Sequence, residues 1–291
     1  MLIKVRGLEH SYMEGTPFEN QVLYGVDLDI EEGEMVGLIG PTQSGKSTLI
    51  QYLNGLFIPK IGEVVVDGID VREQRSRLRK LRQKVGLVFQ YPEHQLFEET
   101  VGKDVAFGPK NLGLPEDEVR RRVDSALEAV GLDPEVFRDR YIFALSGGQK
   151  RRVAIAGVLA LNPRVMIFDD PTAGLDPRGR EEILATIKKL HSEQDLTVIF
   201  VSNSLEDIAR LVDRLIVLAQ GKVIMSGTPR EVFSQVKKMR EIGMGILQTV
   251  DVMSRLRDRG WDVATTALTV EEACDEILAC FRKKASGEGR E

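Results

Sequence analysis

Short apolar runs separated by polar turns predict a series of strands in the first 230 residues. Four of these runs are apolar at nearly every position, as is typical of strands buried on both faces of a parallel sheet: residues 35–39, 85–89, 164–168 and 196–201. Apolar residues alternate with polar ones at Val26, Leu28 and Ile30, which predicts a half-buried strand. Residues 214–218 and 222–225 flank Gln220-Gly221 and predict a hairpin.

The pattern becomes helical between about residues 98 and 159. Apolar side chains then recur on one helical face, at Val119, Val123, Ala126, Leu127 and Val130. This segment predicts a helical subdomain inserted into an α/β core. From about residue 229 the composition changes again, and further helical runs predict an appendage to that core, with a helix start near Thr269.

Composition and charge narrow the possible functions. The chain has 291 residues, 42% of them hydrophobic, which suits one large domain or one domain with an appendage. The net charge of −5 argues against a general nucleic-acid binder, and the basic segment 72–84 lacks aromatic residues, so we interpret it as a solvated helix face. Cys274 and Cys280 suit neither a disulfide framework nor a metal site. No apolar run approaches the ~20 residues that span a bilayer, and the N-terminus lacks a signal-peptide core, so we expect a cytosolic chain.

Residues 40–48 fit the pattern G-x-x-x-x-G-K-[ST] of a phosphate-binding loop. A buried strand is predicted before this loop and a helix after it, which is the context that such a loop needs. Successive backbone N–H groups and the positive end of the helix would hold phosphate oxygens. Lys46 would add a charge for the β- and γ-phosphates, and Ser47 a hydroxyl for Mg²⁺. The predicted ATP-binding residues of the loop are Gly40, Pro41, Thr42, Gln43, Ser44, Gly45, Lys46, Ser47 and Thr48.

Three further positions carry candidate chemistry. Asp169 and Asp170 end an apolar strand, where the first could hold Mg²⁺ and the second could orient an attacking water. The run Ser146-Gly147-Gly148-Gln149 opens a helix and could bind a second anion, although such a run can also be a simple helix cap. Tyr12 lies in a polar stretch, and we weigh stacking on adenine evenly against local packing.

In this order and spacing, the motifs resemble the ATP-binding cassette (ABC) ATPase family over residues 1–230. The resemblance rests on Tyr12, the loop 40–48, Gln90, residues 145–149, residues 165–170, Asp176 and position 203. It implies a P-loop α/β fold with a parallel-sheet core, an antiparallel β part and a helical subdomain at about residues 95–160.

Residues 90–101 and 104–109 are similar to the ATPases of energy-coupling factor (ECF) transporters, as is an extension at residues 231–291. In that family the extension helps two ATPase subunits pair. Those ATPases drive uptake of vitamins or transition-metal ions through a membrane coupling subunit and a membrane substrate-binding subunit. The resemblance therefore implies a peripheral protein at the cytoplasmic face of the cell membrane.

The same resemblance implies a role for each matching residue. Tyr12 would stack on adenine, Lys46 would hold phosphates, and Ser47, Gln90 and Asp169 would serve Mg²⁺. Asp170, Asn203 and Gln90 would be the catalytic residues. Ser146, Gly147, Gly148 and Gln149 would act on the ATP of a partner subunit, with Asp176 in an inter-subunit loop.

Three positions depart from the family pattern, which usually has glycine where this chain has Gln43, glutamate where it has Asp170 and histidine where it has Asn203. Asp170 shortens the reach to water by about 1 Å, and Asn203 cannot carry a proton. The departures fit an asymmetric pair with one weak site, an inactivated variant or tolerated changes. Alternative functions are another ABC importer, a soluble ABC protein acting on DNA or ribosomes, and a subunit that binds nucleotide with little hydrolysis.

Overall fold

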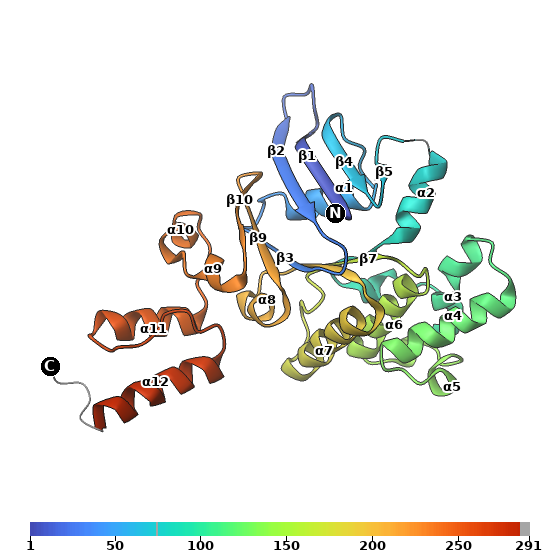
Figure 1. The fold of residues 1–291 in the computed structure, drawn as a ribbon. Coiled ribbons are helices and arrows are strands. Elements are labelled where there is room, and N and C mark those ends of the chain that lie inside the picture. Colours follow the sequence, from blue (N-terminus) through green and yellow to red (C-terminus); the bar gives the residue numbers. More distant parts are fainter. Residues whose placement is uncertain (74, 286–291) are drawn as a thin grey trace.

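A computed structural model describes residues 1–73 and 75–285. Within this part of the chain, the central sheet has six strands in the order β10-β9-β3-β8-β7-β6, of which Figure 1 labels β10, β9, β3 and β7. The strands are β3 (Met35–Ile39), β6 (Val85–Val88), β7 (Val165–Asp169), β8 (Thr197–Val201), β9 (Arg214–Ala219) and β10 (Lys222–Gly227). Only β10 pairs antiparallel to its neighbour; the other pairs are parallel. The carboxyl ends of β3, β6, β7 and β8 therefore meet at one edge, where ligands bind in parallel sheets.

A second, antiparallel sheet has the order β2-β1-β4-β5 and is formed by β1 (Ile3–Tyr12), β2 (Asn20–Ile30), β4 (Ile61–Val66) and β5 (Ile69–Asp70). The predicted strand around Val26 is the second half of β2, which starts at Asn20. Its alternating exposure places Val26, Leu28 and Ile30 in the core. The register between β1 and β2 is irregular between Val5 and Leu8, and Tyr12 pairs with Asn20 at the end of the ladder.

The segments between β6 and β7 are mainly helical. They comprise η1 (Pro92–Gln95), α3 (Val101–Asn111), α4 (Glu116–Ala129), α5 (Pro134–Phe137), η2 (Ile142–Ala144) and α6 (Gly147–Leu159). The predicted apolar face of α4 is buried, since Val119, Val123, Ala126 and Leu127 all lie in the core. The inserted helical region is thus present, and α3, α4 and α5 lie at one end of the molecule in Figure 1.

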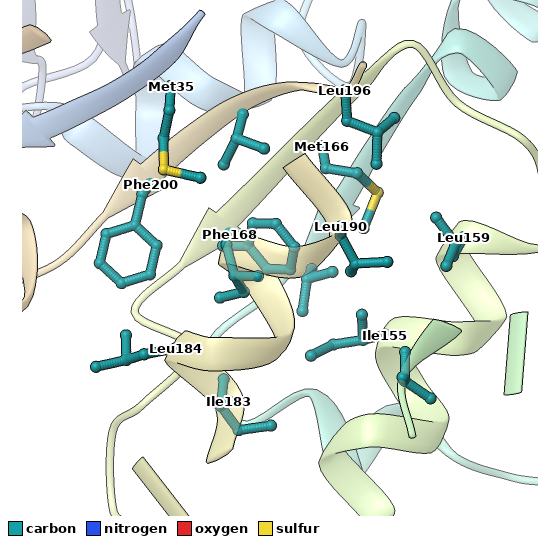
Figure 2. Packing of buried hydrophobic residues seen from close by; sticks show 14 of the residues in the cluster. Met35, Ile155, Leu159, Met166, Phe168, Ile183, Leu184, Leu190, Leu196 and Phe200 are labelled. Atoms are coloured by element: carbon teal, nitrogen blue, oxygen red, sulfur yellow. The ribbon is translucent and has the colours of Figure 1, made fainter. Parts of the chain in front are cut away.

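Two main hydrophobic clusters lie on opposite faces of the central sheet. One is shared with the antiparallel sheet and with α1 (Lys46–Leu53) and α2 (Arg75–Lys84). The other packs the sheet against helices that include α6, α7 (Pro177–Gln194) and α8 (Leu205–Leu211). Figure 2 shows Phe168 and Phe200 of the sheet facing Ile183 and Leu184 of α7. Burial on both faces explains why these strands are apolar at nearly every position.

The C-terminal helices divide between two packing units. They are α9 (Pro229–Phe233), α10 (Val236–Glu241), α11 (Gln248–Asp258) and α12 (Val270–Ala285). Side chains from α9, α10 and the start of α11, among them Phe233, Met239 and Val250, belong to the main cluster on the α7 face. A separate small cluster is formed by Met253, Val263, Ala267, Ala273 and Cys280. The independent packing unit therefore begins near Met253, and a domain boundary at residue 230 stays a prediction.

The predicted helix start near Thr269 is present. Thr269 Oγ1 accepts a hydrogen bond from the backbone N–H of Glu272 at 3.2 Å, and the Glu272 carboxylate accepts one from the N–H of Leu268 at 2.9 Å. Helix α12 continues to Ala285, and residues 286–291 lie outside the described part. Cys274 is exposed and Cys280 buried, and neither is bridged. Across the described residues, no helix has the length and apolar character that crossing a membrane requires.

Candidate nucleotide site

A polar pocket of about 810 Å³ opens beside the phosphate loop. Three parts of the chain line it: Tyr12 with residues 20–22 and Tyr24, residues 43–48, and residues 220–222. The first part comes from the end of β1 and from β2, and the third is the tip of the β9–β10 hairpin. The sequence predicts the phosphate loop and Tyr12 in this site. It does not predict the start of β2 or the hairpin tip there, because nothing local in those segments points to a ligand.

The phosphate loop is held by close packing against neighbouring backbone and side chains. A Cβ at Gly40 would lie 1.9 Å from the carbonyl oxygen of Leu218 in β9, and one at Gly45 would lie 2.6 Å from Leu23 Cδ2. The Lys46 ammonium donates to the carbonyl oxygens of Gly40 at 2.8 Å and Pro41 at 2.9 Å. Burial lowers the pKa of Lys46, whereas the negative charges of Asp169 and Asp170 raise it. Gly40, Pro41 and Thr42 do not line the pocket, whereas residues 43–48 do.

Gln43 has a left-handed backbone conformation, with φ of 65°. This conformation favours glycine, because a Cβ brings a steric cost of about 1–2 kcal/mol. Gln43 therefore stands where the family pattern has glycine and where the backbone conformation itself favours glycine. Its side chain also lines the pocket.

Tyr12 makes local contacts and also lines the pocket. Its hydroxyl lies 3.0 Å from Thr48 Oγ1, and its ring packs edge-on against His10 with centroids 4.3 Å apart. The side chain is still 38% exposed. Local packing is thus present, and the exposed part leaves room for the adenine stacking that stays a prediction.

Asp169 and Ser47 lie together although they are 122 residues apart in the chain, and the Ser47 hydroxyl donates to Asp169 Oδ2 at 3.3 Å. Burial raises the pKa of Asp169, and the neighbouring negative charge of Asp170 raises it further, whereas the hydrogen bond from Ser47 lowers it. A hydroxyl and a carboxylate oxygen at this separation fit a hard cation that keeps most ligands from water and phosphate, as Mg²⁺ does. The described residues contain no cluster of three or more His, Cys, Asp or Glu side chains that could hold a metal by themselves.

Asp170 is bound by two donors at the end of β8. Asn203 Nδ2 donates to its Oδ2 at 3.3 Å, and the Ser202 hydroxyl donates to its Oδ1 at 3.4 Å. Burial raises the pKa of Asp170, and the negative charge of Asp207 raises it further. The hydrogen bonds from Asn203 and Ser202 lower it. Asp170 also has a positive φ, of 48°. The structure therefore brings two of the three predicted catalytic residues into direct contact.

Gln90, the third, lies two residues after the end of β6, the strand that pairs with β7. Its side chain is exposed, does not line the pocket and makes no hydrogen bond within the described residues. Two residues later the chain enters η1, where Glu93 forms an ion pair with Arg151 of α6 at 2.7 Å. Arg151 is only 1% exposed and also donates to the carbonyl oxygens of Pro171 and Ala173. The sequence shows no sign of this buried contact between three distant segments.

The run Ser146–Gln149 forms a capping box at the start of α6. Ser146 Oγ accepts from the N–H of Gln149 at 3.3 Å, and Gln149 Oε1 accepts from the N–H of Ser146 at 3.0 Å. Asp176 likewise caps α7 by accepting from the N–H of Gly179 at 2.7 Å. Neither segment lines the pocket of its own chain.

Comparison with known proteins gives concordant results. A family model described as "ABC transporter" matches residues 23–173. The chain is 50% identical to the energy-coupling factor transporter ATP-binding protein EcfA2 of Clostridium tetani, over 98% of this chain and 99% of the relative. It is 52% identical to the EcfA2 protein of Clostridioides difficile, over 97% of this chain and 98% of the relative.

Solved structures agree. The chain is similar to cbiO1 of Clostridium perfringens, part of the ABC transporter complex cbiONQ, with a TM-score of 0.73 and 40% identity over 83% of this chain and 94% of the other. It is also similar to a dimeric ATP-binding cassette in a post-hydrolysis state bound to ADP and Pi, with a TM-score of 0.69 and 32% identity over 78% of this chain and 99% of the other. The chain belongs to the ABC ATPase family, as an ECF transporter ATP-binding protein of the EcfA2 type, and is an ATPase coupled to transport.

Proposed function

We propose that this ATPase subunit binds Mg-ATP in the pocket beside the phosphate loop and pairs with a second, homologous ATPase subunit. Tyr12 would face the base, Lys46 the phosphates, and Ser47 and Asp169 the Mg²⁺. When bound, Mg²⁺ would neutralise charge on the β- and γ-phosphates. The support is geometric: the pocket continues from the exposed edge of Tyr12 to the phosphate loop, and Ser47 joins that loop to Asp169.

The observation that carries the pairing is the openness of Gly147 and Gly148. A Cβ at either glycine would meet no atom within 4 Å, and neither residue has a positive φ. Neither packing nor backbone conformation within this chain therefore requires glycine there. Glycine is useful where another molecule approaches the backbone closely, and a phosphate at a helix start is such a molecule. A similar cassette is dimeric and bound to ADP and Pi, which supports pairing of two nucleotide-binding subunits.

We further propose that the chain's own half-site turns over slowly while its Ser146 loop supports hydrolysis at the partner's site. The departures at Gln43, Asp170 and Asn203 all lie in the half-site of this chain. Asp170 has a shorter side chain than glutamate, and Asn203 cannot donate a proton from a charged ring. The loop offered to the partner, residues 146–149 with Asp176, matches the family pattern. A subunit that binds nucleotide with little hydrolysis of its own is the limiting case of this proposal.

In the assembled transporter, closure of the two ATPase subunits would move a membrane coupling subunit and a membrane substrate-binding subunit. The chain would then act as a peripheral subunit at the cytoplasmic face of the membrane. A vitamin or a transition-metal ion would be the transported substrate. The support for this assembly is that the chain belongs to the ECF ATPases. Recognition of the transported substrate would lie in another chain.

Two variants in the purified complex test this division of labour. Ser146→Arg places a bulky cation in the loop offered to the partner and should remove most of the ATPase activity. Asp170→Asn should change the rate little, because the own site contributes little. Ser125→Arg makes the same change on the exposed side of α4 and serves as the control. If Asp170→Asn stops hydrolysis and Ser146→Arg is harmless, the division of labour is wrong.

A further inference from the structure

An ion pair between Arg180, which is 37% exposed, and a buried Asp207 adjoins the two loops that carry the proposed catalytic residues and contains none of them. Asp207 of α8 is 1% exposed. Arg180 of α7 donates through Nε to both carboxylate oxygens, at 2.9 and 3.1 Å, and through a terminal nitrogen to Oδ1 at 2.7 Å. The pair raises the pKa of Arg180, and this bidentate geometry fixes the orientation of both side chains.

The pair also contacts one residue in each catalytic loop. The Thr172 hydroxyl, two positions after Asp170, donates to Asp207 Oδ2 at 3.2 Å and is itself buried. Arg180 donates to Ser204 Oγ, directly after Asn203, and the same hydroxyl oxygen accepts from the N–H of Asp207. Helix α7, which carries Arg180, begins next to Asp176. The hydrogen bond from Asn203 to Asp170 joins the same two loops at the other end.

We infer that Arg180 and Asp207 form a positioning pair that holds the loop 170–176 and the loop 202–204 at a fixed separation. A buried carboxylate needs several donors, and here they are Thr172 of the 170–176 loop and Arg180 of the helix that follows this loop. The loop 202–204 is joined to the pair through Ser204, which binds both Arg180 and the N–H of Asp207. Moving either loop breaks a hydrogen bond to a member of this ion pair. The inference rests on the proposed function, because it takes Asp170, Asn203 and Asp176 as the groups that act on ATP.

Simple docking of α7 on α8 is the competing explanation, and the chain offers a matched control for it. Arg210 of α8 and Glu181 of α7 form a second bidentate ion pair between the same two helices, at 2.8 and 3.2 Å. Both side chains are more than half exposed, and neither bonds to residues 170–176 or 202–204. A pair that only docks the helices should behave like this one.

The test measures ATP hydrolysis and thermal stability of the assembled transporter carrying Thr172→Val, Thr172→Ser, Asp207→Asn or Glu181→Gln. Thr172→Val keeps the volume and the ion pair and removes only the bond to the 170–176 loop. It should lower kcat on the order of tenfold, because the loosened loop carries Asp176, which would act at the partner's site, and small misplacements of reacting groups are costly. KM for ATP should stay within about twofold, since none of these residues lines the nucleotide pocket. Thr172→Ser should restore the rate, and Glu181→Gln should leave kcat unchanged.

Thr172→Val keeps the test valid if Asp207→Asn does not fold. The inference is overturned if Thr172→Val leaves kcat unchanged or if Thr172→Ser fails to restore it. It is also overturned if kcat falls only in proportion to the loss of melting temperature, for which Glu181→Gln gives the reference ratio. These results are separable from failure of the proposed function, which Ser146→Arg reports in the same complex. A complex that stops with Ser146→Arg but ignores Thr172→Val retains the function and loses the inference.

Discussion

Asn203 donates its side-chain amide to Asp170 at 3.3 Å, so the two polar residues at the ends of β7 and β8 bind each other directly. Both positions depart from the family pattern, and the contact shows that the two departures act at one point in space. An amide donor holds the carboxylate without adding a charge or an exchangeable acid. Compared with the glutamate and histidine of the family pattern, Asp170 and Asn203 therefore keep a hydrogen bond in the site. They lack the longer reach of glutamate and the titratable ring of histidine.

Restoring both residues should raise activity. We expect Asp170→Glu combined with Asn203→His to increase ATP hydrolysis by the complex on the order of tenfold or more, because water orientation and transition-state donation each contribute ~10²–10³-fold in other sites. Each single variant should gain less, since the residues touch and their effects are coupled. Steady-state ATPase assays measure this. An unchanged rate in the double variant would show that the two departures are tolerated.

Removing the cation of the phosphate loop should weaken nucleotide binding. Lys46→Ala deletes a charged donor in a partly buried site, and hydrogen bonds to charged groups contribute about 1.5–3 kcal/mol. We expect Mg-ATP affinity to fall about tenfold to a hundredfold, by isothermal titration calorimetry. Tyr12→Ala should weaken ATP more than it weakens inorganic triphosphate, because only ATP carries a base to stack. Equal affinity in Lys46→Ala and the unchanged chain would contradict the assignment of the pocket.

The hairpin tip should contribute to the same site. Lys222 lines the pocket, is exposed and has no ion-pair partner within the described residues. Lys222→Ala should weaken Mg-ATP about threefold at low salt, and the difference should shrink at high salt as screening increases. Lys237→Ala on α10 removes an exposed lysine away from the pocket and is the control. Identical affinities for both variants at low salt would remove the hairpin from the site.

The face of α12 should support pairing of ATPase subunits. Leu278 and Phe281 are 50% and 54% exposed, and Phe281 packs edge-on against Trp261. Leu278→Asp should raise the dissociation constant of the ATPase pair at least tenfold, because it places a charge in an apolar contact. Analytical ultracentrifugation of the two subunits measures this. Phe18→Asp makes a similar change at a 77% exposed residue in the β1–β2 loop and should have no effect. Equal pairing of the two variants would give the extension another role.

The buried ion pair between Glu93 and Arg151 should make stability depend on pH. Burial opposes ionisation of Glu93, but hydrogen bonds from Arg151 and the backbone outweigh it, so the pKa of Glu93 is lowered. A lowered pKa in the folded chain favours the folded state wherever the carboxylate is ionised. This contribution is complete above the unfolded pKa of about 4.3 and is lost as the pH falls through the lower folded value.

We therefore expect Glu93→Gln to reduce the free energy of unfolding by about 1.5–3 kcal/mol at pH 7, and by less as the pH falls below about 4. Denaturant unfolding at several pH values measures the difference. Glu99→Gln removes an exposed ion pair with Lys103 and should cost less than about 1 kcal/mol at pH 7. A Glu93→Gln deficit that is the same at every pH would mean that the pair stabilises through packing alone.

The sequence alone determines the local features of this protein. Buried strands are apolar at consecutive positions, and α4 has its apolar residues on one face, so periodicity predicts both. The phosphate loop and the two caps at Ser146 and Thr269 are also local, because each needs only a few neighbouring residues to form its hydrogen bonds. These patterns predict an α/β core with an inserted helical segment, and the resemblance that the motifs carry implies the P-loop ABC fold, which the comparisons confirm.

Only the tertiary structure decides which distant segments meet. Periodicity does not encode strand order, yet strand order sets Asp169 beside Ser47 and Asn203 beside Asp170. The same holds for β2 and the hairpin tip in the nucleotide pocket, and for Arg180 and Asp207 behind it. Each of these contacts joins side chains that are ordinary in their own segments. Their energy comes from burial and from partners that the folded chain brings together, so no local pattern can carry it.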